Sequence, residues 1–170
     1  MIAMLRTAIA LVLLAVPMSG IAAAQRPAPV AEAAVGWVGF ADDGIVSELL
    51  VGGAARWYVL PRIAIGPEIL FLNGEFDSHL VITGNLTVDL LGPRNGQPRE
   101  VTPFLVVGGG MFQTNEDFPA GSFTSREGAF TLGGGVRAKA GERVTLGLDA
   151  RVGWETHLRV NGTVGIRLGR

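Results

Sequence analysis

The chain has 170 residues, with 14 basic and 15 acidic side chains and no cysteine. Its near-neutral charge lacks the basic excess of nucleic-acid-binding domains, so no nucleic-acid partner is expected. Without cysteine the chain can form no disulfide, thiolate nucleophile or thiolate metal site, and nothing in the composition calls for a cofactor.

The N-terminal residues have the order of a secretory signal peptide. Arg6 precedes an apolar run from Ala8 to Met18, and the small residues Ala22 to Ala24 follow it. The run is too short for a membrane-spanning helix, which needs about 20 apolar residues. We therefore expect three segments, namely a signal peptide over residues 1–24, a flexible lead-in over 25–30 and one barrel domain over 31–170.

The rest of the chain consists of β-rich runs separated by turn signals such as Asn73-Gly74 and Gly141-Glu142. The longest stretch between two runs, Thr114 to Arg126, is expected to be a surface loop. Counting the runs predicts eight strands, at about residues 33–41, 46–59, 62–72, 79–91, 101–113, 127–139, 143–154 and 158–168.

Most of these runs alternate between apolar and polar side chains, as the two faces of a strand require. In the run 143–154, for example, Leu146 and Leu148 share one face, while Thr145 and Asp149 share the other. The runs 33–41 and 101–113 are apolar on both faces and do not reveal which face points inward. Eight such runs predict an all-β fold, an antiparallel up-and-down barrel.

Three features indicate that the apolar face points outward into lipid. The charged face also carries small residues, and its cations are arginine with one exception, as suits charge pairs in a narrow lumen. Trp57, Phe71 and Trp154 lie near the ends of runs on the apolar face, where lipid-facing aromatic girdles occur. The signal peptide would also deliver the chain to the compartment from which transmembrane barrels insert. We therefore predict a transmembrane β-barrel.

The charged face would then line the lumen. Eight strands leave an interior just wide enough to be filled by side chains, so we expect a paired internal charge network that plugs the barrel. The expected members of this network are Glu48, Arg56, Glu68, Asp89, Arg137, Asp149, Arg151, Arg159 and Arg167.

Several segments resemble the outer-membrane protein β-barrel domain family, which includes the small OmpA/OmpX-like and opacity-type barrels of Gram-negative bacteria. These segments are Thr102–Phe104, Gly108–Gly110, Gly133–Arg137, Gly141–Val144 and Asp149–Arg151, and the likeness covers residues 31–168. The resemblance implies an N-terminus in the periplasm and insertion by the barrel-assembly machinery. It also implies surface loops near residues 42–45, 73–78, 114–126 and 155–157.

We expect no enzymatic activity. An outer-membrane lipid hydrolase would need a histidine beside a serine and an acid, and Ser78-His79 with Glu75 or Asp77 comes nearest. Adjacent residues on a strand point to opposite faces, so Ser78 and His79 are poorly placed to share a proton. The acidic pairs Asp42-Asp43, Glu75/Asp77 and Glu116-Asp117 lack calcium-loop spacing, so no metal site is expected.

These observations favour an integral protein of the bacterial outer membrane with a structural or surface-interaction role. Its partners would be outer-membrane lipid, the barrel-assembly machinery during insertion, and any surface ligand that its loops bind. The first alternative is a secreted or periplasmic lipocalin-like barrel whose apolar face encloses a hydrophobic ligand. The second alternative is an outer-membrane lipid hydrolase.

Overall fold

The structure, a computed structural model, describes residues 27–41, 45–74, 77–92, 99–118, 121–154 and 157–169. The expected signal peptide lies outside the described residues. None of the described residues forms a helix of the length and apolarity that crossing a membrane requires. The elements are β1 (Val30–Ala41), β2 (Ile45–Leu60), β3 (Ile63–Asn73), β4 (Asp77–Asp89), β5 (Val101–Phe118), β6 (Gly121–Lys139), β7 (Val144–Gly153) and β8 (His157–Arg167).

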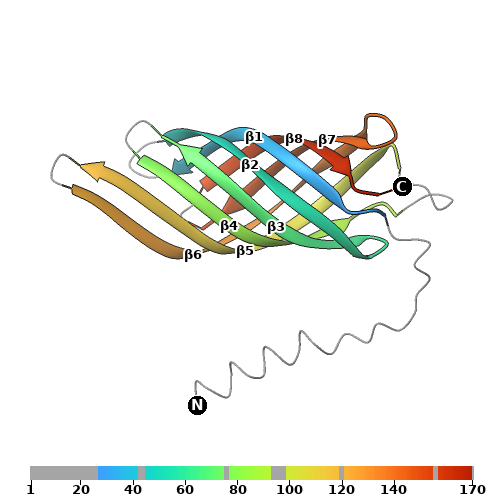
Figure 1. Cartoon of the computed structure of the whole chain (residues 1–170), viewed down its shortest axis with the longest axis horizontal. Coiled ribbons are helices and arrows are strands. Elements are labelled where there is room, and N and C mark those ends of the chain that lie inside the picture. Colours follow the sequence, from blue (N-terminus) through green and yellow to red (C-terminus); the bar gives the residue numbers. More distant parts are fainter. Residues whose placement is uncertain are drawn as a thin grey trace, which may run out of the picture.

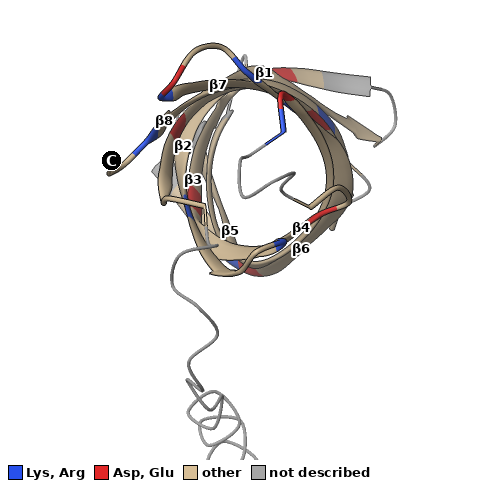
Figure 2. Ribbon diagram, turned by 90° about the vertical axis from the view of Figure 1, so that its right-hand side faces the viewer, with Lys and Arg blue, Asp and Glu red and all other residues tan. Residues whose placement is uncertain are grey.

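The eight strands form a closed antiparallel barrel, which confirms the expected fold class. Each strand pairs with the next one along the chain, and β8 returns to pair with β1 from Val30↔Arg167 to Phe40↔His157. Figure 1 shows the tilted strands from the side, and Figure 2 shows the ring that they close. Closure gives the backbone N–H and C=O groups of β1 and β8 partners that an open sheet would leave free at its edges.

The barrel has two different ends. At the proximal end β2 joins β3, β4 joins β5 and β6 joins β7, and the described chain begins and ends there. The turn from β6 to β7 contains Gly141 with a φ of 122°, a conformation that residues with a side chain rarely adopt. The backbone N–H of Leu168 donates to the carbonyl of Pro29 at 2.7 Å, which ties the two described termini together. The distal end carries the connections after β1, β3, β5 and β7.

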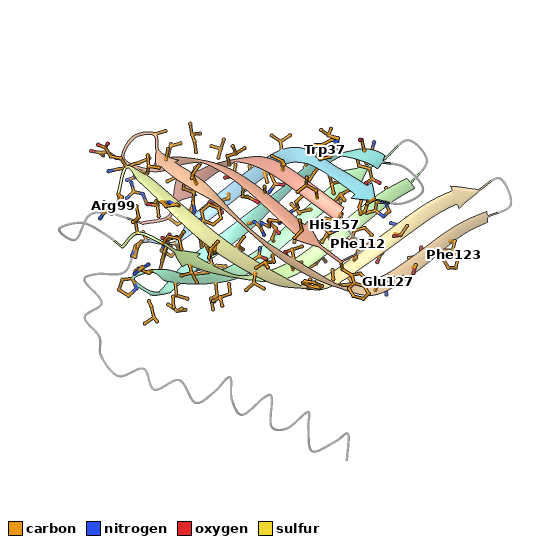
Figure 3. The ribbon with its side chains drawn as sticks, turned by 180° about the vertical axis from the view of Figure 1, so that it is seen from behind. Trp37, Arg99, Phe112, Phe123, Glu127 and His157 are labelled. Atoms are coloured by element: carbon orange, nitrogen blue, oxygen red, sulfur yellow. The ribbon has the colours of Figure 1, made fainter. Side chains whose placement is uncertain are left out.

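The prediction of a loop over residues 114–126 is wrong, because β5 and β6 extend into this segment as a β-hairpin. Gln113 pairs with Arg126, and Asn115 with Thr124, in unbroken register. Side chains join the same pairs, since Arg126 Nε donates to Gln113 Oε1 at 2.8 Å and Thr124 Oγ1 donates to Asn115 Oδ1 at 3.1 Å. The polar composition resembles a loop, but a two-stranded ribbon outside the barrel needs no apolar face. This projecting hairpin extends past the distal rim and carries the exposed Phe123 (Figures 1 and 3).

Candidate functional site

The outer wall of the barrel is apolar. Among the described residues, thirty large hydrophobic side chains are exposed, at least two from each strand, whereas only ten hydrophobic residues are buried. A water-soluble protein rarely exposes a contiguous apolar patch of more than a few hundred Å². The three aromatics expected to face lipid, Trp57, Phe71 and Trp154, are 45%, 56% and 52% exposed on this wall. Figure 3 shows side chains of the wall pointing away from the barrel axis.

Charged side chains are excluded from the middle of the outer wall. Among the described residues, every exposed charged side chain lies near a barrel end or on the projecting hairpin. Glu127 is an example at the distal end. The pairing of β6 with β7 starts at Thr131, so Glu127 lies beyond the closed part of the barrel. The exposed charged residues are Arg62, Arg99, Glu100, Arg126, Glu127, Lys139, Glu142 and Arg143.

Apolar side chains line much of the distal half of the lumen. Phe40 lies between two histidines there, with ring centroids 5.8 Å from His79 and 5.5 Å from His157. The sequence did not reveal the parts of this cluster that come from β1 and β5, because these strands are apolar on both faces, whereas its members on β2, β3 and β4 share the inward parity of Glu48, Glu68 and His79. Its buried members are Val38, Leu50, Leu70, Leu72, Val81 and Phe112.

Glu68 of β3 is the centre of the charged middle of the lumen. It accepts from Arg159 Nη2 at 2.7 Å and from Arg151 Nη2 at 3.2 Å, so it joins β3 to β7 and β8 across the lumen. Arg151 also donates through Nε to Asp149 at 2.9 Å, and the amide of Asn161 donates to both oxygens of Asp149. All five side chains are buried, and cation and carboxylate alternate along this chain of contacts.

A second group of charges lies toward the proximal end. Arg137 of β6 donates to Asp89 of β4 at 2.9 Å, and the Tyr58 hydroxyl of β2 donates to the other oxygen of Asp89 at 2.9 Å. The Arg137 guanidinium stacks on the Phe104 ring, 4.0 Å from its centroid, which fixes its plane. This group also includes Arg56, which pairs with Glu32 at 3.1 Å.

The nine residues expected in the internal charge network divide into three sets. Seven of them form the two groups above. Glu48 contacts His79 Nε2 at 3.1 Å in the distal half, and Arg167 lies at the proximal mouth, where it donates to the main-chain carbonyl of Glu142. Across the two groups four arginines face four carboxylates, because Glu32 joins as the partner of Arg56. Such balance reduces the cost of burying charge.

The expected charge network left out four polar residues that take part in it inside the barrel. Tyr58 and Asn161 share the parity of neighbouring arginines, so alternation alone could have placed them in the lumen. Glu32 was missed because β1 begins at Val30, three residues before the expected start. His79 shares the inward parity of Thr83, but its only expected role was catalytic; it is buried between Glu48 and Thr114, whose Oγ1 lies 3.0 Å from its Nδ1.

Of the hydrolase residues, the structure describes the side chains of Ser78 and His79, and it places them on opposite faces of one strand. Ser78 is exposed, and His79 is buried on the opposite face of β4. Glu75 lies outside the described residues, and only the backbone of Asp77 is described. Asp42 and Asp43 also lie outside them, and the side chains of Glu116 and Asp117 are not described. Within the described ranges no cluster of three or more His, Asp or Glu side chains could hold a metal ion.

Several solved structures share this fold at low sequence identity. The Neisserial surface protein A, NspA, matches with a TM-score of 0.67 and 12% identity over 82% of this chain and 96% of that one. The N-terminal β-barrel domain of Pseudomonas aeruginosa OprF matches with 0.65 and 14%, over 85% and 100%. A transmembrane β-barrel designed de novo matches with 0.54 and 15%, over 84% and 97%. No protein-family profile matches the chain. No curated protein sequence matches it either.

Proposed function

We propose that this chain is an integral β-barrel of the bacterial outer membrane, with a structural or surface-interaction role and no enzymatic activity. The observation that carries the proposal is its sidedness: leucine, valine and isoleucine cover the outer wall, while arginine and carboxylate side chains lie in the lumen. In water this arrangement would expose apolar surface and bury charge, and both cost free energy. In lipid the same arrangement is favourable.

The dimensions and the backbone also suit a bilayer. A membrane-spanning β-strand needs about 9–11 residues when tilted, and the shortest strand here, β7, has 10. A closed barrel satisfies its backbone hydrogen bonds between strands, which hydrocarbon requires because it contains no water. The charged residues at the two barrel ends would then meet the headgroups and the water beyond them. The likeness to a designed transmembrane barrel supports the same placement.

The interior of this barrel is plugged in our proposal. The distal half of the lumen is occupied by the apolar cluster around Leu50 and Leu70, each at most 1% exposed. Below it, Glu68 connects β3 with β7 and β8 across the lumen, and Asp89 connects β4 with β6. An ion crossing the barrel would have to displace both layers.

A surface role would belong to the distal end. If the N-terminus lies in the periplasm, as the family resemblance implies, the projecting hairpin of β5 and β6 extends outside the cell (Figure 1). Its tip carries the exposed Phe123 among polar residues, and aromatic side chains are common anchors in protein interfaces. The likeness to a Neisserial surface protein supports this location.

Membrane fractionation combined with a heat-shift gel tests the proposal. We expect the protein in the outer-membrane fraction, extractable only with detergent, and migrating differently before and after boiling because the folded barrel resists the detergent. A protein soluble in the periplasm without detergent would favour the lipocalin-like alternative. The exposed apolar wall argues against that alternative, which requires the apolar face to point into the barrel.

A further inference from the structure

The proximal mouth of the lumen contains a cavity with an excess of cations. The empty space between its walls is ≈ 610 Å³, a figure that includes the open solvent at the mouth. The described residues that line it include five cations and one carboxylate, Asp89. The cations are Arg56, Arg99, Arg137, Lys139 and Arg167. Figure 3 shows Arg99 at this end of the barrel.

The carboxylates nearby neutralise only part of this charge. Arg56 uses Nη2 for Glu32, and Arg137 uses Nη2 for Asp89, which leaves three positive charges in excess along the cavity and its border. Arg99 and Arg167 donate to main-chain carbonyls, those of Gly92 and Glu142, which carry no net charge. The cavity therefore attracts anions.

Two of these arginines are almost completely buried. Arg56 and Arg137 are 7% and 6% exposed, and the Nε–H of each has no hydrogen-bond partner among the described residues. Because little water screens these two buried guanidinium groups, their attraction for an anion in the cavity is stronger than that of an exposed arginine. The stacking of Arg137 on Phe104 holds its guanidinium ready, so little side-chain entropy would be lost on binding.

The rest of the cavity lining is largely apolar. Val30 and Leu91 contribute aliphatic side chains, and Pro27, Pro61 and Ala138 lie beside them. A bare inorganic anion would contact the arginines but leave this apolar part in contact with water. A ligand that carries both an anionic group and an apolar group would use the whole cavity.

We propose that the proximal mouth binds a phosphate monoester with an apolar substituent, in addition to the structural role argued above. The phosphate oxygens accept from Arg56 and Arg137, whose forked donors suit phosphate geometry. The excess of three positive charges matches a dianionic monoester better than a singly charged carboxylate. The apolar substituent packs on Val30 and Leu91. Such a group occurs in soluble phosphate esters and in lipid headgroups with a terminal phosphate.

Tyr58 provides a local reporter of binding. It is the only tyrosine in the chain, lines the cavity, and bridges Asp89 and Arg137 through its hydroxyl. Protein labelled with ¹³C-tyrosine and folded in dodecyl maltoside micelles would therefore give one ring signal from the site. We expect phenyl phosphate to shift this signal saturably, inorganic phosphate to bind about tenfold more weakly, and phenol to produce no saturable shift. Dihexanoyl phosphatidic acid separates the sources, because tighter binding than phenyl phosphate would identify a lipid headgroup and weaker binding a soluble ester.

Variants then assign the binding to the cavity. Arg56→Gln should weaken phenyl phosphate binding about tenfold, and Lys139→Gln, an exposed residue whose loss does not threaten the fold, about threefold. Arg143→Gln is the control, since Arg143 is exposed at the same end but does not line the cavity, and its affinity should stay within about twofold of the parent.

Three results would overturn this proposal. The first is the absence of a saturable shift of the Tyr58 signal with phenyl phosphate. The second is equal affinity for phenyl phosphate and inorganic phosphate. The third is an equal loss of affinity in the Lys139→Gln and Arg143→Gln variants. Because the measurement uses protein already folded in micelles, none of these results would bear on the membrane location proposed above.

Discussion

Replacing Leu148 with arginine would place a cation in the middle of the outer wall. Leu148 is 55% exposed and is the fifth of the ten residues of β7. Its cross-strand partners, Val136 and Gly162, carry no carboxylate that could pair with the new charge. The cost of the substitution therefore depends on whether lipid or water surrounds this face.

The two environments predict different costs. In a bilayer, an arginine at mid-depth on the wall of a barrel costs ~2–4 kcal/mol, and one near the interface ~0–1 kcal/mol. The larger cost corresponds to a fall of about 30- to 700-fold in the folding equilibrium constant. Leu168→Arg is the matched control, because Leu168 is 50% exposed but lies just beyond the end of β8. On a wet surface both substitutions would stay within ~0.5 kcal/mol of the parent.

Urea-dependent folding into phospholipid vesicles, followed by tryptophan fluorescence, measures both variants. We expect the midpoint of Leu148→Arg to fall well below that of Leu168→Arg, with a matching loss of the heat-shifted band on gels. If the two variants unfold together at the midpoint of the parent, the outer wall is not in hydrocarbon and the reasoning fails.

Three further predictions concern the lumen and the wall. Glu68→Gln should lower the free energy of unfolding by ~3–5 kcal/mol, because it leaves Arg151 and Arg159 without their shared carboxylate. The double variant Glu68→Gln with Arg159→Gln should cost less than the sum of the two single changes. Strict additivity in urea titrations would contradict the pairing. Gly133→Ala should lower the free energy of unfolding by ~1–3 kcal/mol, since the new Cβ would lie 2.7 Å from the Cα of Arg151. The control Gly109→Ala, whose Cβ would have no atom within 4 Å, should keep the stability of the parent. Equal urea midpoints of the two variants would refute this account of crowding. In planar bilayers the parent protein should show no large, stable conductance steps, and their appearance would exclude a plugged lumen.

The strands and their sidedness were accessible from sequence because lipid and lumen demand opposite side chains. In β7 the apolar parity of Leu146 and Leu148 is exposed, and the polar parity of Asp149 and Arg151 is buried, as alternation indicated. Where both faces are apolar, the same reasoning had nothing to compare. Val38 and Phe112 belong to the buried cluster in the distal lumen, yet their strands gave no sign of which parity points inward.

The projecting hairpin shows a different limit of sequence reasoning. Turn signals and polar residues over 114–126 indicated a loop, but hydrogen-bonded pairing continues from Gln113↔Arg126 to Phe118↔Gly121. Outside the bilayer neither face of a strand has to be apolar, so alternation disappears while the strand persists. Composition therefore cannot separate a wet β-ribbon from a loop.

The partners within the internal charge network depend on how the barrel closes. Glu68 and Arg159 are 91 positions apart in sequence and meet only because β3 and β8 face one another across the lumen. Alternation predicted that both side chains point inward, and it could not say which charges pair. The pairing of Glu32 with Arg56 likewise depends on β1 beginning as early as Val30.

Tryptophan quenching tests the central claim most directly. The chain contains three tryptophans, Trp37, Trp57 and Trp154, and all three are exposed on the outer wall, by 39%, 45% and 52%. In vesicles whose lipids carry bromine on their acyl chains, we predict strong quenching of tryptophan fluorescence and little quenching by aqueous iodide. Strong iodide quenching with no effect of the brominated lipids would place these side chains in water and contradict the account.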